Sequence, residues 1–335
     1  MLEAMLYEKQ AGYKIHCFLC SQHCSIKPGQ WGVCNVRENR DGILYTHAYG
    51  EVIAANTDVI EKKPLYHFLP GTRSFSIGTA GCNFSCSFCQ NWQISQYTGQ
   101  NNHDRHTLKL SPGEVIQAAL QNNCRSIAYT YTEPTIFFEY AYDIAQIARK
   151  EGLANVFVSN GFMTEQALDT ITPYLDAVNI DLKSFQKEFY RRICHGRLQP
   201  VLDTIQRLYE RDIWTEVTTL VVPGQNDSEE ELRNIAAFLF SVNPEIPWHI
   251  SRFHPDYQFD HTGPTPLKTM EWARAIGKKE GLFYIYLGNV MTGASDTVCP
   301  RCGKAVISRR GGEIHTTLKG NVCPTCGLKI PGRFQ

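Results

Sequence analysis

The sequence predicts an α/β fold in which helices cover a parallel sheet, and three observations support this. Seven short apolar segments, rich in β-branched and aromatic residues, alternate with helical patterns. Such alternation is typical of parallel sheets. Polar residues follow nearly every segment at its carboxyl end, where barrel enzymes build their active sites. The predicted strands are residues 75–79, 126–131, 156–159, 177–182, 216–222, 248–253 and 283–287.

The alternation fits either a doubly wound open sheet or a barrel. No Gly-x-Gly-x-x-Gly motif follows the first strand, which excludes the dinucleotide-binding version of the open sheet. Ser111, Pro112 and Glu114 have the spacing of a capping box, and Ser228 has the same spacing to Glu231. These patterns predict two helix starts. Further helices are predicted to open at Thr164, Pro200 and Pro266.

The composition is that of a soluble globular protein. The 335 residues include 33 basic and 33 acidic side chains, and this balance argues against a chain built to coat nucleic acid or an anionic membrane. The first residues lack the basic and apolar regions of a secretory signal. No apolar run approaches the roughly 20 residues that span a bilayer. We therefore expect a cytoplasmic protein with no membrane partner.

Thirteen cysteines in a cytoplasmic chain indicate metal binding rather than disulfides, because thiols there are kept reduced. Cys124 and Cys194 stand alone and are predicted to be packing residues. The other eleven form three clusters. These are Cys17, Cys20, Cys24 and Cys34; Cys82, Cys86 and Cys89; and Cys299, Cys302, Cys323 and Cys326.

The central cluster places three thiolates on one loop with the spacing C-x3-C-x2-C. A structural zinc site normally has four ligands, and an iron–sulfur cubane normally takes four cysteines. Three cysteines therefore predict an iron–sulfur cluster with one iron left open. The same spacing is also compatible with a disulfide or with part of a zinc site.

The two flanking clusters divide the chain into three predicted parts. Residues 1–60 form a cysteine-rich segment that binds either zinc or an auxiliary cluster, and nearby histidines favour zinc. Residues 61–295 carry the α/β domain. Residues 296–335 contain two C-x2-C knuckles, which predict a zinc ribbon. Seven Lys/Arg against one Glu in residues 299–335 make the ribbon basic, but zinc-bound thiolates would offset part of that charge, so nucleic acid is not the expected partner.

The pattern Cys82-x3-Cys86-x-Phe88-Cys89 resembles the radical SAM superfamily, in its pyruvate formate-lyase activating-enzyme-like branch. The resemblance implies a partial (β/α)6 TIM-like barrel, a [4Fe-4S] cluster on the three cysteines, and S-adenosylmethionine as cofactor. With both flanks included, the chain looks most like the radical SAM component of the AmmeMemoRadiSam system. The supporting stretches are residues 17–20, 32–39 and 61–71.

The resemblance also implies roles for individual residues. Tyr131-Thr132-Glu133-Pro134 looks like the family's Gly-Gly-Glu-Pro stretch without its glycines, and Val158 stands where the activases place a cation-binding Asp. Asp181 and Lys183 match an Asp-Leu-Lys triplet and are the predicted catalytic pair, with an ordinary salt bridge as the alternative. The predicted cofactor-binding residues are Phe88, Glu133, Ser159, Asn160, His254 and, from its place at a strand end, Asn289.

The predicted reaction is reductive cleavage of S-adenosylmethionine to a 5′-deoxyadenosyl radical, which then abstracts a hydrogen atom from an unknown substrate. The expected partners are an electron donor such as flavodoxin or ferredoxin and, by the likeness to activases, a protein substrate. Two other classes of function stay open. One is a zinc-dependent module that binds protein or nucleic acid, and the other is an iron–sulfur protein of electron transfer.

Overall fold

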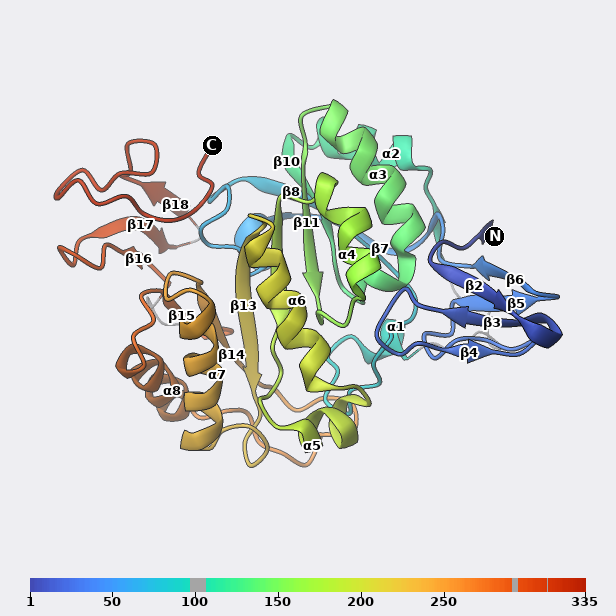
Figure 1. Cartoon of the computed structure of the whole chain (residues 1–335). Coiled ribbons are helices and arrows are strands. Elements are labelled where there is room, and N and C mark those ends of the chain that lie inside the picture. The colour runs from blue at the N-terminus through green and yellow to red at the C-terminus, as the bar shows by residue number, and fades with distance from the viewer. Residues whose placement is uncertain (97–106, 291–294, 312) are drawn as a thin grey trace.

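The computed structural model describes residues 1–96, 107–290, 295–311 and 313–335, and its centre is a nine-stranded sheet (Figure 1). The strand order across this sheet is β15-β14-β13-β12-β11-β10-β8-β7-β9. The strands are β7 (Glu51–Val59), β8 (Arg73–Thr79), β9 (Leu108–Lys109), β10 (Cys124–Tyr129), β11 (Ala154–Ser159), β12 (Ala177–Asp181), β13 (Trp214–Val221), β14 (Trp248–Arg252) and β15 (Ile285–Gly288).

The strand order excludes the doubly wound alternative. β8 and β10 to β15 are parallel, and each pairs with the next strand in chain order. A doubly wound sheet must reverse its order at a switch point, whereas a barrel continues in one direction. Within the described residues β15 pairs with β14 alone, and β8 carries the antiparallel β7 on its other side, so the barrel is not closed. The predicted α/β fold with a parallel sheet is confirmed.

The helices between the strands bury apolar faces against the sheet. The Ser111 capping box is present in full, whereas Ser228 caps its helix by accepting from the Glu231 backbone N–H. Glu231 turns its carboxylate to Ser184 and to the Phe185 backbone instead of closing a box. The helices are α1 (Trp92–Ser95), α2 (Pro112–Gln121), α3 (Phe138–Lys150), α4 (Glu165–Ile171), α5 (Lys187–Phe189), α6 (Leu198–Glu210), α7 (Glu229–Val242) and α8 (Leu267–Lys279). No helix in the described part of the chain is long and apolar enough to span a membrane.

The N-terminal segment forms two small antiparallel sheets at one side of the molecule (Figure 1). One sheet contains β2 (Tyr7–Gln10), β3 (Lys14–Cys17) and β4 (Ser25–Ile26). The other contains β1 (Leu2–Glu3), β6 (Ile43–Thr46) and β5 (Arg37–Arg40). The same segment of residues 1–60 also supplies β7, which extends the central sheet.

The C-terminal residues form a ribbon on the opposite side, made of β16 (Thr297–Val298), β17 (Ala305–Arg310) and β18 (Glu313–Thr316) (Figure 1). Its cysteines and apolar residues pack against Tyr66, Tyr284 and Tyr286. Arg309 of β17 reaches across to donate to the Tyr66 carbonyl and lies over the Tyr66 ring. The ribbon is therefore docked on the sheet.

A buried polar network lies beneath the ribbon, at the amino end of the strands. The Glu216 carboxylate accepts from His249 Nε2 at 2.6 Å, Trp214 Nε1 at 3.0 Å and the backbone N–H groups of Tyr66 and His67. His67 Nδ1 donates to the Pro331 carbonyl at 2.7 Å. Burial lowers the pKa of His67 to about 4, so its ring is neutral and its Nε2 accepts from the Tyr286 hydroxyl at 2.6 Å.

Candidate active site

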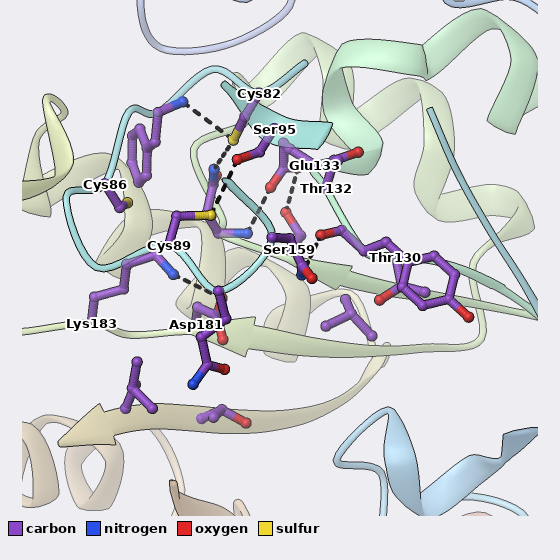
Figure 2. Close-up of a pocket in the computed structure, with 18 of the residues that line it drawn as sticks. Cys82, Cys86, Cys89, Ser95, Thr130, Thr132, Glu133, Ser159, Asp181 and Lys183 are labelled. Carbon is purple, nitrogen blue, oxygen red and sulfur yellow. Dashed lines mark hydrogen bonds and ion pairs between the residues drawn. The ribbon is translucent and has the colours of Figure 1, made fainter. Parts of the chain in front are cut away.

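A cavity of about 350 Å³ opens at the opposite, carboxyl end of the parallel strands (Figure 2). This volume falls in the range of small-molecule sites. The loops that follow β8, β10, β11 and β12 all contribute to it. Among the residues that line it are Cys82, Cys86, Phe88, Cys89, Glu133, Ser159, Asn160, Asp181 and Lys183. The structure therefore brings together the three central cysteines and most of the predicted polar residues.

The cysteine loop is held by backbone hydrogen bonds to two neighbouring turns. Ser85 N and Ser87 N donate to the carbonyls of Cys194 and Ile193, at 3.2 and 3.0 Å. Gly81, at a φ of +99°, donates to the carbonyl of Ile94 in α1 at 2.8 Å. A residue with a Cβ would be strained at that φ. The loop thus has a fixed course at the mouth of the sheet.

The three thiols have different surroundings within one group (Figure 2). Burial, followed by the nearby Glu133, raises the pKa of Cys82 well above its usual value. The Cys194 thiol and then Lys183 lower the pKa of Cys86. The Cys89 sulfur lies 3.1 Å from the hydroxyl of Ser95. The structure therefore stabilises the thiolate of Cys86 most.

Glu133 is buried under these sulfurs, and its carboxylate is the hub of a hydrogen-bond network. Oε1 accepts from Thr135 N, Thr135 Oγ1 and Ser159 Oγ at 3.0, 2.6 and 2.8 Å, and Oε2 accepts from Asn160 N at 2.8 Å. Burial raises the pKa of Glu133, and these four donors act against that rise. A carboxylate oxygen has two lone pairs, so Oε2 retains capacity for one more donor.

Asn160 links this network to the cysteine loop. Its Oδ1 accepts from Phe162 N at 3.0 Å, and its Nδ2 donates to Asn83 Oδ1 at 2.7 Å. Asn83 is fully buried beside Cys82, and its own Nδ2 has no partner among the described residues. An unpaired buried amide costs about 1–3 kcal/mol, which indicates that a bound group satisfies it. We find here an unused donor at the foot of the cysteine loop.

Asp181 and Lys183 form an ion pair at the end of β12, with Lys183 Nζ 2.9 Å from Asp181 Oδ2. Burial lowers the pKa of Lys183, but Asp181 and then Cys86 raise it more, so the ammonium stays charged. The same Nζ lies 5.9 Å from the centroid of the Phe88 ring. The pair is about one-third exposed at Asp181 and faces the cavity.

Two predicted cofactor residues lie apart from this group. His254 is exposed, and neither His254 nor Asn289 is among the residues that line the cavity. Asn289 Nδ2 donates to Ser251 Oγ at 3.0 Å, and Ser251 does line it. A cofactor-binding role for His254 and Asn289 stays a prediction. Val158, where the activases have a cation ligand, lines the cavity.

The sequence did not single out Lys62, Lys63 and Tyr131 as site residues, although all three line the cavity. Tyr131 adopts a φ of +68°, a left-handed conformation that glycine adopts freely, and it stands at the place of the first glycine in the family's Gly-Gly-Glu-Pro pattern. A Cβ at Gly78 would meet the Tyr131 side chain at 3.1 Å, so Gly78 provides its space. The absence of a glycine at position 131 was the one signal in the sequence that could have drawn attention to Tyr131. It could not show that Tyr131 itself adopts a left-handed conformation.

The C-terminal cysteines form the compact group that the knuckles predict. Their four sulfurs lie within 4.8 Å of one another, with Cys299–Cys326 at 3.6 Å and Cys302–Cys323 at 3.7 Å. Zn–S bonds of about 2.3 Å give tetrahedron edges of about 3.8 Å, so the group can hold one metal ion. That the ion is zinc stays a proposal.

The chain is similar to known proteins. The family model described as the radical SAM superfamily matches residues 76–239, a span that contains the cysteine loop, Glu133 and the Asp181–Lys183 pair. An uncharacterized protein of Methanocaldococcus jannaschii is 43% identical over 311 residues, which cover 92% of each chain. A protein of the same organism named as a glycyl-radical enzyme activating enzyme is 26% identical, over 52% of this chain and 65% of its own.

A solved structure shows the same fold. Streptococcus suis SuiB, bound to S-adenosylmethionine, superimposes with a TM-score of 0.51 at 11% identity, covering 69% of this chain and 53% of that one. Its match concerns the fold alone. The family model, the three-cysteine loop and the cavity at the carboxyl ends agree, and the chain contains a radical SAM superfamily domain over residues 76–239.

Proposed function

We propose that this protein is an enzyme that cleaves S-adenosylmethionine reductively and uses the resulting radical to take a hydrogen atom from a substrate. One observation carries the proposal: the Cys82–Cys89 loop and the Glu133 carboxylate open on the same cavity of about 350 Å³. A binding module or an electron carrier needs no such combination of thiolates and buried carboxylate around an open space.

Cys82, Cys86 and Cys89 would hold a [4Fe-4S] cluster. Two features of the site fit that group. Among the described residues, Asn83 Nδ2 is buried beside Cys82 without a hydrogen-bond partner. The three sulfurs do not all lie within 4.8 Å of one another, unlike those of the C-terminal ribbon, so they are not already gathered around the position of a single ion. When bound, such a cluster supplies the electron that breaks a sulfonium bond of the cofactor and leaves a 5′-deoxyadenosyl radical.

Glu133 would receive the amino group of the cofactor at Oε2, the oxygen that has only one donor in the structure. Ser159 and Asn160 orient that carboxylate through the hydroxyl and backbone N–H that they donate to it. Phe88 packs between Phe189 and Phe259 and forms an apolar wall of the cavity. These contacts would fix the cofactor before reduction, which prevents side reactions of a radical.

Asp181 and Lys183 would provide a charge pair at the substrate side of the cavity. Because Lys183 stays protonated, it can donate a hydrogen bond to an anionic or carbonyl group without moving a proton. His254, as the likeness to the activases implies, and Asn289, from its place at a strand end, would bind the cofactor at the rim of the site.

We propose a protein substrate with a glycyl radical as product, because the relative named as a glycyl-radical enzyme activating enzyme covers half of this chain. The electron would come from a flavodoxin or a ferredoxin. The flanking cysteine-bearing segments favour membership of the AmmeMemoRadiSam group. Zinc in the C-terminal ribbon and a cytoplasmic location belong to the same proposal.

The test is anaerobic reconstitution of the full chain with iron, sulfide, a strong reductant and S-adenosylmethionine, followed by measurement of 5′-deoxyadenosine. We expect product from the wild type and from Cys124→Ala, a control that removes a buried thiol at the start of β10, the end of the strand away from the cavity. We expect none from Cys86→Ala. Equal product from the wild type and Cys86→Ala would contradict the proposal, and reversible reduction without cleavage would favour an electron carrier.

A further inference from the structure

We infer that Cys17, Cys20, Cys24 and Cys34 hold a second iron–sulfur cluster that lies directly against the loop of the first. From the sequence alone, these four cysteines could bind either zinc or an auxiliary iron–sulfur cluster. The inference concerns metal binding and does not depend on the proposed reaction.

The N-terminal fold brings the four cysteines together. Cys17 ends β3 and its N–H donates to the carbonyl of Cys24 at 2.9 Å. A Cβ placed on Gly32 would lie 3.8 Å from both the Cys24 and the Cys34 sulfurs. Cys17, Cys20 and Cys34 are each more than nine-tenths buried. His23 N donates to the carbonyl of Cys20 at 3.1 Å, so a tight turn joins Cys20 to Cys24.

The spacing of these sulfurs differs from that of the C-terminal ribbon. Among the described residues, the ribbon holds the one set of three or more His, Cys, Asp or Glu ligands whose atoms all lie within 4.8 Å of one another. No three of the N-terminal sulfurs therefore all lie within 4.8 Å of one another, whereas the ligand sulfurs of one tetrahedral ion stand about 3.8 Å apart. On a cubane each thiolate binds a different iron, so the thiolates stand farther apart.

A buried arginine faces the same group. Arg37 is 1% exposed, and its Nη1 donates to Cys17 Sγ at 3.5 Å and to the Met5 carbonyl at 2.9 Å. Its Nη2 pairs with Glu139, and its Nε has no partner among the described residues. A buried cation with an unused N–H beside thiols is suited to an anionic centre, and hydrogen bonds to sulfur tune cluster potentials.

The two cysteine loops touch. A Cβ on Gly81, the residue before Cys82, would lie 2.7 Å from the Cys34 carbonyl oxygen. Gln22, between Cys20 and Cys24, donates to the carbonyls of Asn83 and His195 at 2.8 and 3.1 Å. A cluster on the N-terminal cysteines would thus be the immediate neighbour of one on the central loop.

The first experiment counts metal in reconstituted full-length chains. A triple variant with Cys82, Cys86 and Cys89 changed to Ala lacks the central site, and we expect it to retain about half of the wild-type iron and sulfide. Cys20→Ala with Cys34→Ala should retain the other half. About two zinc ions and no iron in the triple variant would overturn the inference. Since this variant cannot cleave S-adenosylmethionine, the result is independent of the proposed function.

The second experiment uses paramagnetic resonance and does not require loss of a ligand. In the triple variant, Arg37→Lys should lower the reduction potential of the remaining cluster, because a hydrogen bond to Cys17 is lost. An unchanged potential would show that the cluster is not beside Arg37. In the fully reduced wild type, the two neighbouring clusters should couple, so that its spectrum differs from the sum of the single-cluster spectra. A spectrum equal to that sum would overturn the contact.

Discussion

The two ends of the parallel sheet both carry buried polar groups, but they use them differently. At the amino end, Glu216, His249, His67 and Tyr286 bond to one another and to backbone groups. At the carboxyl end, Glu133 and Asp181 face a cavity, and Asn83 Nδ2 has no partner among the described residues.

The difference shows which end is built for stability and which for ligands. A satisfied polar network fixes one packing arrangement, and a partly satisfied one costs free energy until something binds. Barrel enzymes follow the same division between the two ends of their strands. We therefore expect changes at the amino end to alter stability, and changes at the carboxyl end to alter chemistry.

The largest effect should come from Glu216→Ala at the amino end. The change leaves His249, the Trp214 indole and two backbone N–H groups buried without an acceptor. We expect the free energy of unfolding in urea to fall by about 3–5 kcal/mol. Glu229→Ala, which removes an exposed carboxylate on α7, is the control and should change it by less than about 0.5 kcal/mol. A loss below about 1 kcal/mol for Glu216→Ala would refute the stabilising role of the network.

The next effect is the pH dependence that His67 confers. Its pKa is lowered from 6.5 to about 4 in the folded protein. The unfolded chain therefore binds more protons between these values, and stability falls as the pH falls from 6.5 toward 4. We expect a loss of about 3 kcal/mol from this group. Urea unfolding across that pH range measures the slope, which His67→Gln should reduce; an unchanged slope would assign it to other groups.

A third effect tests the contact between the two cysteine loops. Gly81→Ala would bring a Cβ to 2.7 Å from the Cys34 carbonyl oxygen, in addition to the cost of its φ of +99°. We expect a loss of about 1–3 kcal/mol in the free energy of unfolding, with less iron bound. Gly224→Ala is the matched control, because it has a φ of +73° with nothing within 4 Å of its Cβ. Equal losses in the two variants would show that the loops do not press together.

Lys183→Met should have the smallest effect on stability of these changes, but a large effect on the formation of 5′-deoxyadenosine. Lys183→Met removes the partner of a carboxylate that is about one-third exposed, so we expect a loss of less than about 1 kcal/mol. Formation of 5′-deoxyadenosine in the presence of substrate should fall by about tenfold or more. Lys187→Met on the exposed face of α5 is the control. Unchanged activity in Lys183→Met would reduce the Asp181–Lys183 pair to an ordinary salt bridge.

The local parts of this structure could be predicted from the sequence. Residues 177–182 read as a strand because of their apolar and β-branched content, and β12 spans Ala177–Asp181. Ser111 and Glu114 predicted a helix start that the capping box confirms. The compact ribbon of four cysteines followed from knuckle spacing alone. Each of these signals lies within a few residues of the structure that it specifies.

Contacts between distant residues could not be predicted. Arg37 meets Glu139 across 102 positions, and Gln22 meets Asn83 across 61. β7 joins the central sheet although it belongs to the predicted cysteine-rich segment of residues 1–60. Nothing in a single sequence fixes such pairs, because they depend on how packed elements meet. His254, which the resemblance placed at the site, does not line the cavity in this structure, and its cofactor-binding role stays a prediction.

The order of strands in the sheet has a consequence for how the chain folds during synthesis. Each parallel strand from β10 onward meets a neighbour that the ribosome has already released, so the sheet can grow in the direction of translation. The amino end closes only later. Arg333 pairs with His67 and Leu69, more than 260 positions earlier, and Pro331 accepts from His67. Until residues 331–333 emerge, His67 Nδ1 lacks its acceptor, so the polar network at the amino end of the sheet is completed last.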